Sequence, residues 1–301
     1  MELKLKDIRE IGNIELLARQ MVEGFITGLH KSPYHGFSVE FAEHQLYNSG
    51  ESTRHIDWKV FAKTDRLYTK RYEEETNLRC HLVIDCSSSM YYPQDTNGKI
   101  TFSLMAAAAL TYLLQKQRDA VGIFAFTDQI DIQTPVRSTA THAHKLLLIL
   151  DRLLKQESKN KSTSIAPVLN EIAQKIHKRS LVIVFSDLFH NQLHHEEVFT
   201  ALQHLKHQKN EVLIFHVSDR QTELDFEFED RPYEFIDLES GQKTRLVPGD
   251  IKSSYREAMK SYYQEIKMKC NQFKIDLVEV DIKEPFNKVL TQYLIKRARM
   301  K

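Results

Sequence analysis

Oxygen-bearing side chains follow two apolar runs in this sequence. Asp85 comes directly after the run HLVI, and Ser87 and Ser89 follow it at a spacing of two residues. A second run, LVIVFS, ends immediately before Asp187. Carboxylates and hydroxyls are hard ligands that suit Mg²⁺, Mn²⁺ or Ca²⁺ better than they suit zinc. These residue types therefore indicate a site for one divalent cation, if the fold brings the two runs together.

The elements that would position these residues can be read from hydrophobic periodicity. From about residue 78 onward, short apolar runs rich in β-branched and aromatic residues alternate with amphipathic segments, which is typical of parallel strands covered by helices on both faces. We expect strands at 79–85, 120–126, 180–186, 211–217 and 275–281, and helices at 101–117, 140–157, 164–178, 195–208, 250–272 and 285–298. The alternation predicts a doubly wound α/β fold with a mostly parallel sheet. The segment 128–136 follows a strand directly and predicts one antiparallel edge strand.

Open parallel sheets bind their ligands beyond the carboxyl ends of the strands. This rule places Asp85 and Asp187 at one edge, together with the hydroxyls of Ser162, Thr163 and Ser164 at the start of a predicted helix. Two carboxylates would balance the charge of a divalent ion. With three hydroxyls they would fill about five of the six positions around Mg²⁺, which leaves one position open.

The chain divides into two parts at about residue 78. Residues 1–77 form an N-terminal helical and irregular extension that we expect to pack on the domain formed by residues 78–301. Within the domain, two short strand-like pieces joined by Ser240-Gly241 predict a hairpin insertion near 219–249.

The ordered set of oxygen donors resembles the metal-ion-dependent adhesion site of von Willebrand factor A-type domains. Asp85, Ser87 and Ser89 match its D-x-S-x-S loop, and Asp187 matches its distal Asp. The resemblance also assigns Thr163 to the Thr of that site. It implies a von Willebrand factor A-like, Rossmann-like fold and one Mg²⁺ (or Mn²⁺ or Ca²⁺) held by these five residues.

The flanking sequence resembles a bacterial family of unknown function that carries this type of domain. The resemblance rests on FAEHQLYNSGESTRHIDWKVFAKTDRLYTKRYEEETN at 41–77 and covers roughly residues 35–298. Members of that family are commonly encoded beside MoxR-type AAA+ ATPases, which implies such an ATPase or its client as the partner. Two positions depart from the pattern: Ser162 stands where the family usually has Gly, and Leu188 stands where many type A domains have Gly.

In the wider superfamily, the open metal position accepts a carboxylate from a partner protein. The resemblance therefore implies a non-enzymatic, metal-dependent protein interaction module that works as an adaptor or cofactor in complex assembly or maturation. Candidate partner-binding residues lie in the N-terminal extension: Trp58 is the only tryptophan, and Glu73, Glu74 and Glu75 form an acidic run. The alternative for Trp58 is a contact that anchors the extension to the domain.

Three other interpretations of the Asp85 loop remain open. A metal-dependent phosphohydrolase would need a second acid two residues after the nucleophilic Asp, where this chain has Ser87. A structural assembly protein would bind no metal there. The loop could also be a polar turn that caps the next helix.

Composition narrows the class of protein further. An apolar content of 42%, a charged content of 28% and a net charge of +1 are those of a globular protein without a general attraction for nucleic acid. The longest apolar stretch, 104–114, is shorter than the ~20 residues that a membrane helix needs. Three cysteines without paired spacing, and a charged N-terminal segment without an apolar core, predict a cytoplasmic protein.

Overall fold

The computed structural model describes residues 13–30, 44–46, 61, 68–70, 78–96, 98–156, 165–188, 195–207, 209–238 and 241–299. Its contacts divide the chain into two compact units. The first unit contains the chain up to Phe25 and from Leu78 onward, and the second contains residues 26–77. In the second unit, β1 (His44–Leu46) pairs antiparallel with β2 (Tyr68–Lys70). All five predicted metal ligands belong to the first unit.

A six-stranded sheet forms the centre of the first unit. Its strands lie in the order β10-β7-β6-β3-β4-β5, and every neighbouring pair is parallel except β4 with β5. The inner strands are almost entirely buried, with Arg79 as the only exposed residue of β3 and none exposed in β6. The predicted α/β class with one antiparallel edge strand is confirmed. The strands are β3 (Arg79–Asp85), β4 (Ala120–Phe126), β5 (Ile130–Gln133), β6 (Leu181–Ser186), β7 (Glu211–Ser218) and β10 (Asp276–Asp281).

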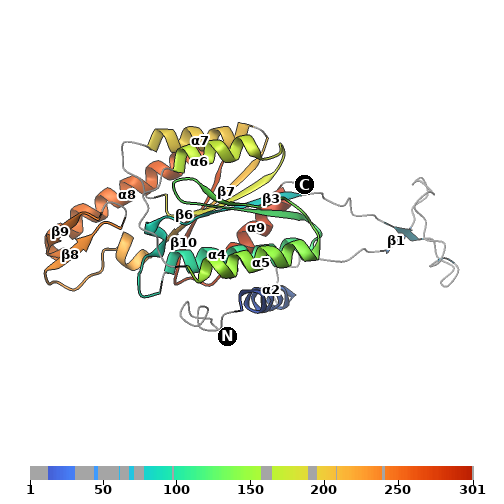
Figure 1. Ribbon diagram of the computed structural model, residues 1–301, viewed down its shortest axis with the longest axis horizontal. Helices are drawn as coiled ribbons and strands as arrows, with labels where there is room; N and C mark the ends of the chain where they lie inside the picture. Colours follow the sequence, from blue (N-terminus) through green and yellow to red (C-terminus); the bar gives the residue numbers. More distant parts are fainter. Residues whose placement is uncertain are drawn as a thin grey trace. The chain divides into compact units, whose positions relative to one another are not determined.

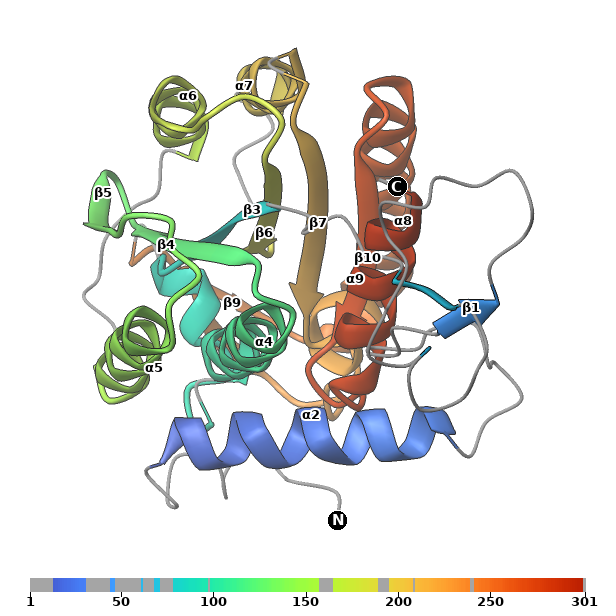
Figure 2. The ribbon, with the colours of Figure 1, turned by 90° about the vertical axis from the view of Figure 1, so that its right-hand side faces the viewer.

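Helices cover both faces of this sheet. Helices α4 and α5 lie on one face, and α6 and α7 lie on the other (Figures 1 and 2). Helix α9 contacts α4 and β10, and the last turns of α8 contribute Ile266 and Cys270 to the core beneath α6 and α7. The helices are α4 (Gly98–Lys116), α5 (Ala140–Leu154), α6 (Ile165–Lys175), α7 (His195–His207), α8 (Pro248–Gln272) and α9 (Asn287–Arg299).

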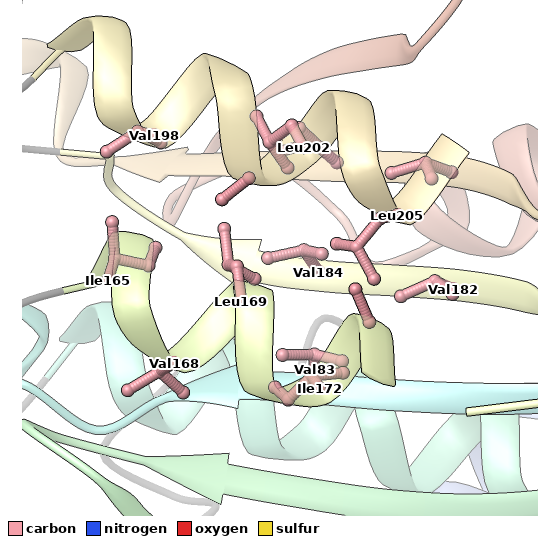
Figure 3. Close-up of a cluster of buried hydrophobic side chains, with 14 of the residues drawn as sticks. Val83, Ile165, Val168, Leu169, Ile172, Val182, Val184, Val198, Leu202 and Leu205 are labelled. Carbon is pink, nitrogen blue, oxygen red and sulfur yellow. The ribbon is translucent and has the colours of Figure 1, made fainter. Parts of the chain in front are cut away.

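The core between the sheet and helices α6 and α7 is made largely of branched aliphatic side chains (Figure 3). Val83 and Val184 project from adjacent strands toward Leu169 of α6 and Leu202 of α7. Full burial of one such side chain contributes about 1.5–3 kcal/mol. Because this core includes Leu188, immediately after Asp187, it reaches the edge of the sheet where the metal site is predicted.

A segment that follows β7 adds a small layer of its own. A π-helical turn, η4 (Arg220–Leu224), is followed by β8 (Tyr233–Ile236), which pairs antiparallel with β9 (Lys243–Leu246). Aromatic rings hold this segment together, since Phe226 packs 4.3 Å from Tyr255 of α8 and 5.7 Å from Phe235 of β8, measured between ring centroids. Through these contacts, η4 and α8 form one packed group beside the carboxyl end of β7.

The first part of α2 (Ile14–His30) belongs to the same unit as the sheet. Its apolar face is buried at Leu17 and Val22, and the hydroxyl of Tyr112 in α4 donates a hydrogen bond to Glu23 at 3.2 Å. The helical periodicity in this part of the sequence is therefore that of a helix with one buried side.

Candidate metal centre

The loop after β3 brings three of the predicted ligands together. Asp85 is fully buried and Ser87 is nearly so. Oδ1 of Asp85 accepts a hydrogen bond from the backbone N–H of Ser87 at 2.9 Å, which turns the loop back toward the strand end. The hydroxyls of Ser87 and Ser89 form a hydrogen bond with each other, with 3.0 Å between their oxygens. Two ligands at right angles around Mg²⁺ are separated by about 3 Å, so this spacing suits a shared cation.

Strand β6 delivers Asp187 to the same edge. Ile84 of β3 is paired with Phe185 of β6, so the residues that follow them lie side by side. The hydroxyl of Ser186 donates to Oδ2 of Asp85 at 2.7 Å and accepts from the backbone N–H of Leu188 at 3.0 Å. Ser186 therefore ties the two ligand-bearing loops to each other.

Leu188 adopts a backbone conformation that favours glycine. Its φ of 49° lies in the left-handed region, which costs a non-glycine residue roughly 1–2 kcal/mol. Its side chain is buried in the core beneath α6 and α7, and this burial offsets the cost. Leucine thus occupies a position whose backbone conformation favours glycine.

Two side chains from neighbouring elements fix the backbone of this turn. Nε2 of His216 in β7 lies 2.7 Å from the carbonyl oxygen of Asp187, and because a carbonyl only accepts, Nε2 carries the proton. Burial lowers the pKa of His216 to about 4, so the ring is neutral. The hydroxyl of Tyr262 in α8 donates to the carbonyl of Leu188 at 2.5 Å. The Asp187 turn is thus held from two sides.

The ammonium group of Lys99, which is not among the predicted site residues, also lies at this edge. Helix α4 begins at Gly98 rather than at the expected residue 101, so Lys99 stands in its first turn. The Lys99 side chain is 1% exposed, and its Nζ lies 2.8 Å from Oδ2 of Asp187 and 2.5 Å from Oε1 of Glu223. A Cβ at position 98 would lie 2.7 Å from Cδ1 of Ile282, so a larger residue there would require the Ile282 side chain to shift.

Glu223 is a third carboxylate at the site and comes from η4. Its Oε2 accepts a hydrogen bond from the backbone N–H of Asp219 at 2.8 Å, and its carbonyl accepts from the hydroxyl of Tyr255 at 2.9 Å. Both contacts lie within the packed group of η4 and α8. Glu223 is therefore positioned independently of its contact with Lys99.

The electrostatics of the site are dominated by burial. Burial raises the pKa of Asp85, and the negative charge of Asp187 raises it further. Burial also raises the pKa of Glu223 despite the opposing effect of Lys99. For Lys99 burial lowers the pKa, but the carboxylates of Asp187 and Glu223 outweigh it and keep the ammonium charged. Three acidic groups thus share one edge with one ammonium.

The donor set fits a hard divalent cation. Asp85, Asp187 and Glu223 carry three negative charges when ionised and Lys99 carries one positive charge, which leaves an excess of two. The hydroxyls of Ser87 and Ser89 add converging neutral oxygens. Within the described part of the chain, no group of three or more His, Cys, Asp or Glu side chains is arranged to hold a metal. A cation here would therefore depend on the serine hydroxyls as well as on the carboxylates.

Several predicted residues lie outside the described residues. These are the predicted ligand Thr163, and the predicted partner-binding residues Trp58, Glu73, Glu74 and Glu75. The hydroxyl of Thr127, which directly follows β4, lies 2.9 Å from carboxylate oxygens of both Asp128 and Asp131. Its hydroxyl thus belongs to the turn between β4 and β5.

The position of Lys99 carries a signal only once the start of α4 at Gly98 is known. A lysine in the first turn of a helix faces the positive end of the helix dipole, which is unfavourable unless a carboxylate lies nearby. Lys99 follows Gly98 at the start of α4, and most of the residues after it in this helix are apolar, so a charged side chain is unexpected there. Glu223 carried no comparable signal, because its position depends on the π-helical turn.

Comparison with known proteins places the chain in a family. The family described as "Protein of unknown function DUF58" matches residues 43–268, which is most of the chain. The chain belongs to this family. The match begins within the second unit and ends in α8, so it includes the D-x-S-x-S loop, Lys99, Asp187 and Glu223.

Similar curated proteins are themselves uncharacterised. "Uncharacterized protein Rv1480" of Mycobacterium tuberculosis (strain H37Rv) and "Uncharacterized protein Mb1516" of Mycobacterium bovis are each 24% identical to this chain over 174 residues. The alignments cover 58% of this chain and 55% of each relative. The chain thus spans about half the length of the curated relatives it matches.

Three solved structures of low sequence identity align with parts of this chain, each with a TM-score under 0.5. BatB from Bacteroides thetaiotaomicron is 14% identical, with a TM-score of 0.44 over 74% of this chain and 98% of that one. A structure titled "von Willebrand factor type A from Catenulispora acidiphila" is 14% identical, with a TM-score of 0.33 over 50% of this chain and 34% of that one. An aerotolerance-related membrane protein from Bacteroides fragilis is 15% identical, with a TM-score of 0.42 over 73% and 99%. These matches say nothing about activity.

A helix that spans a membrane must be both long enough and apolar enough. No helix in the described part of the chain meets both requirements.

Proposed function

We propose that this chain is a non-enzymatic protein interaction module whose binding edge is completed by one divalent cation, Mg²⁺ in the first instance. The observation that carries the proposal is the convergence of Asp85, Ser87, Ser89 and Asp187 at the carboxyl edge of the sheet, together with an excess of two negative charges. Asp85 and Asp187 would supply the charged ligands and the serines the neutral ones. Thr163 would be the fifth ligand.

The chemistry that a bound cation supplies is an acceptor position for a carboxylate from another protein. The chain's own residues prepare the edge for it. Ser186 holds Asp85 in place through its hydroxyl, and His216 holds the backbone of Asp187. Both anchors come from strands rather than from loops, so the ligands are fixed before any partner arrives.

The partner we propose is a MoxR-type AAA+ ATPase or a client of that ATPase, acting in complex assembly or maturation. This follows from the resemblance to the bacterial family that carries the D-x-S-x-S loop. Trp58 and the acidic run Glu73–Glu75 are further candidate contacts. All three cysteines are free thiols, which supports a location in the reducing cytoplasm.

The deciding experiment measures Mg²⁺ binding by isothermal titration calorimetry for wild type and Asp85→Ala. We expect the variant to lose binding, because Asp85 is the buried carboxylate at the centre of the loop. Asp128→Ala is the matched control, since Asp128 is an exposed carboxylate at the same end of the sheet. Equal Mg²⁺ affinity in wild type and Asp85→Ala would contradict the proposal.

A second measurement tests the interaction itself. Pull-downs from a cytoplasmic extract with Mg²⁺ and with EDTA should recover a protein that is lost with EDTA and lost with Asp85→Ala. Generic phosphoesters should show no turnover that depends on Asp85. Turnover that disappears in Asp85→Asn would instead identify a metal-dependent phosphohydrolase.

A further inference from the structure

We propose that Lys99 is a tethered cation that competes with the divalent cation for Asp187 and so sets the metal affinity of the site. The inference rests on the proposed function, because it concerns the same edge of the sheet. The observation behind it is that Nζ of Lys99 lies 2.8 Å from Oδ2 of Asp187, on the carboxylate that the cation would use.

Lys99 is built into this position. Its side chain is 1% exposed, its backbone carbonyl accepts a hydrogen bond from the hydroxyl of Ser103, and its backbone N–H donates to the carbonyl of Tyr92. An ammonium so thoroughly buried, at the unfavourable end of a helix dipole, is stable only because carboxylates surround it. The ion pair between Lys99 and Asp187 is therefore fixed by the fold.

Glu223 gives Lys99 an alternative partner. The ammonium contacts Asp187 and Glu223 together, and Glu223 is held by Asp219 and Tyr255 rather than by the metal ligands. When a divalent cation takes Asp187, Lys99 keeps its contact with Glu223 and moves away from the like charge. Glu223 thus makes the exchange possible without leaving a buried ammonium unpaired.

Removing Lys99 alone makes the site more negative, and this would by itself increase its affinity for a cation. The test therefore needs a variant that lacks Lys99 but has the same net charge at the site as wild type. Asp85, Asp187, Glu223 and Lys99 carry a net charge of −2 when all are ionised. The double variant Lys99→Met/Glu223→Gln leaves two carboxylates and no ammonium, which is also −2. It removes the competitor while it keeps the local charge and the approximate side-chain volumes.

The experiment is a calorimetric titration with MgCl₂ of wild type, Lys99→Met, Glu223→Gln and the double variant, after thermal melts in EDTA confirm folding. Repulsion between buried like charges is large enough that we expect Lys99→Met and the double variant to bind Mg²⁺ about tenfold or more tightly than wild type. Glu223→Gln should bind more weakly than wild type, because the displaced Lys99 loses its alternative partner. Lys116→Met, at the exposed end of the same helix, should bind as wild type does.

The outcomes separate this inference from the proposed function. Mg²⁺ binding to wild type with unchanged or weaker affinity in the double variant overturns the role of Lys99 and leaves the metal site standing. Binding to the double variant but not to wild type supports the competition and contradicts metal-dependent function in the natural protein. No binding to either folded protein overturns both. If Lys99→Met does not fold, the charge-matched double variant carries the test.

Discussion

The two ends of the central sheet both gather buried or half-buried charges, but only one end balances them. At the amino end, helix α9 supplies Arg297 to Asp119, which precedes β4, and supplies Lys296 to the first residues of β7 and β10. Lys206 of α7 adds a contact to Glu211 at 2.6 Å. The carboxylates Asp119, Glu211 and Asp276 thus meet three basic side chains.

The carboxyl end of the same sheet carries three acidic groups and one ammonium. Asp85 and Asp187 end adjacent strands, and Glu223 approaches from η4 to share Lys99 with Asp187. The two ends of the sheet thus differ in whether their buried charges are balanced. Balanced pairs at the amino end fasten α9 to the sheet, whereas the group at the carboxyl end keeps an excess of negative charge, which supports the proposed cation site.

The largest effect is expected from breaking the balanced end. Arg297→Met leaves the fully buried carboxylate of Asp119 without its main cation, which should lower the free energy of unfolding by about 3–5 kcal/mol. Urea denaturation measures this loss. Asp119→Asn in the same chain should recover much of it, because no charge then remains to be compensated. Mg²⁺ affinity at the opposite edge should not change, and a loss of less than ~1 kcal/mol would contradict the structural role of this pair.

A second prediction concerns the interior of β3, between the two charged ends. His81 is 4% exposed, neither ring nitrogen has a hydrogen-bond partner among the described residues, and burial lowers its pKa to about 4. The unfolded chain takes up the proton first as the pH falls, so stability is lost between about pH 6.5 and pH 4, by up to about 3 kcal/mol.

The test for His81 is the difference between two pH profiles of stability. In His81→Phe the ring can no longer titrate, so the stability of wild type relative to the variant should fall progressively as the pH drops from 7 to 4. Buried His216 contributes acid sensitivity to both proteins and cancels in the difference. Parallel profiles would show that His81 is not the neutral buried group described here.

The smallest effect sharpens the comparison at the unbalanced end. Burial and the charge of Asp187 raise the pKa of Asp85, which means that its ionised form is disfavoured in the fold. Asp85→Asn in EDTA at pH 7.5 should therefore raise the free energy of unfolding by about 1 kcal/mol. Chemical denaturation with and without Mg²⁺ checks this, since Mg²⁺ should stabilise wild type and not the variant. If Asp85→Asn were clearly less stable than wild type in EDTA, the fold would stabilise the ionised form of Asp85, which contradicts the prediction.

The positions of the strands could be predicted closely, because each strand is a short apolar run that can be recognised in the sequence by itself. The strands expected at 79–85 and 120–126 have those bounds in the structure, and the other three differ by one residue at one end. A continuous apolar run of β-branched and aromatic residues marks where each strand begins and ends. Helices α5 and α7 also begin at the expected residues 140 and 195, whereas α4 begins three residues before its apolar pattern does.

The candidate site was predicted only in part, for a physical reason. Asp85 and Asp187 follow strands, and the ends of parallel strands meet at one edge whatever the loops do. Lys99 and Glu223 reach the same place only through the early start of α4 and the π-helical turn η4, which no periodic pattern announces. The parts of a site built on strands are therefore open to sequence reading, and those built on irregular turns are not.

The hydroxyl of Ser186 has a consequence for how the edge moves. It donates to Asp85 at the end of β3 and accepts from the backbone N–H of Leu188 in the loop after β6. The two loops that it links are far apart in the sequence, because Ser186 and Asp85 are 101 positions apart. The two loops must therefore open in one cooperative event rather than fray separately. The backbone amide hydrogens of Ser87 and Leu188 should therefore exchange with solvent at the same rate, because the same opening event exposes both.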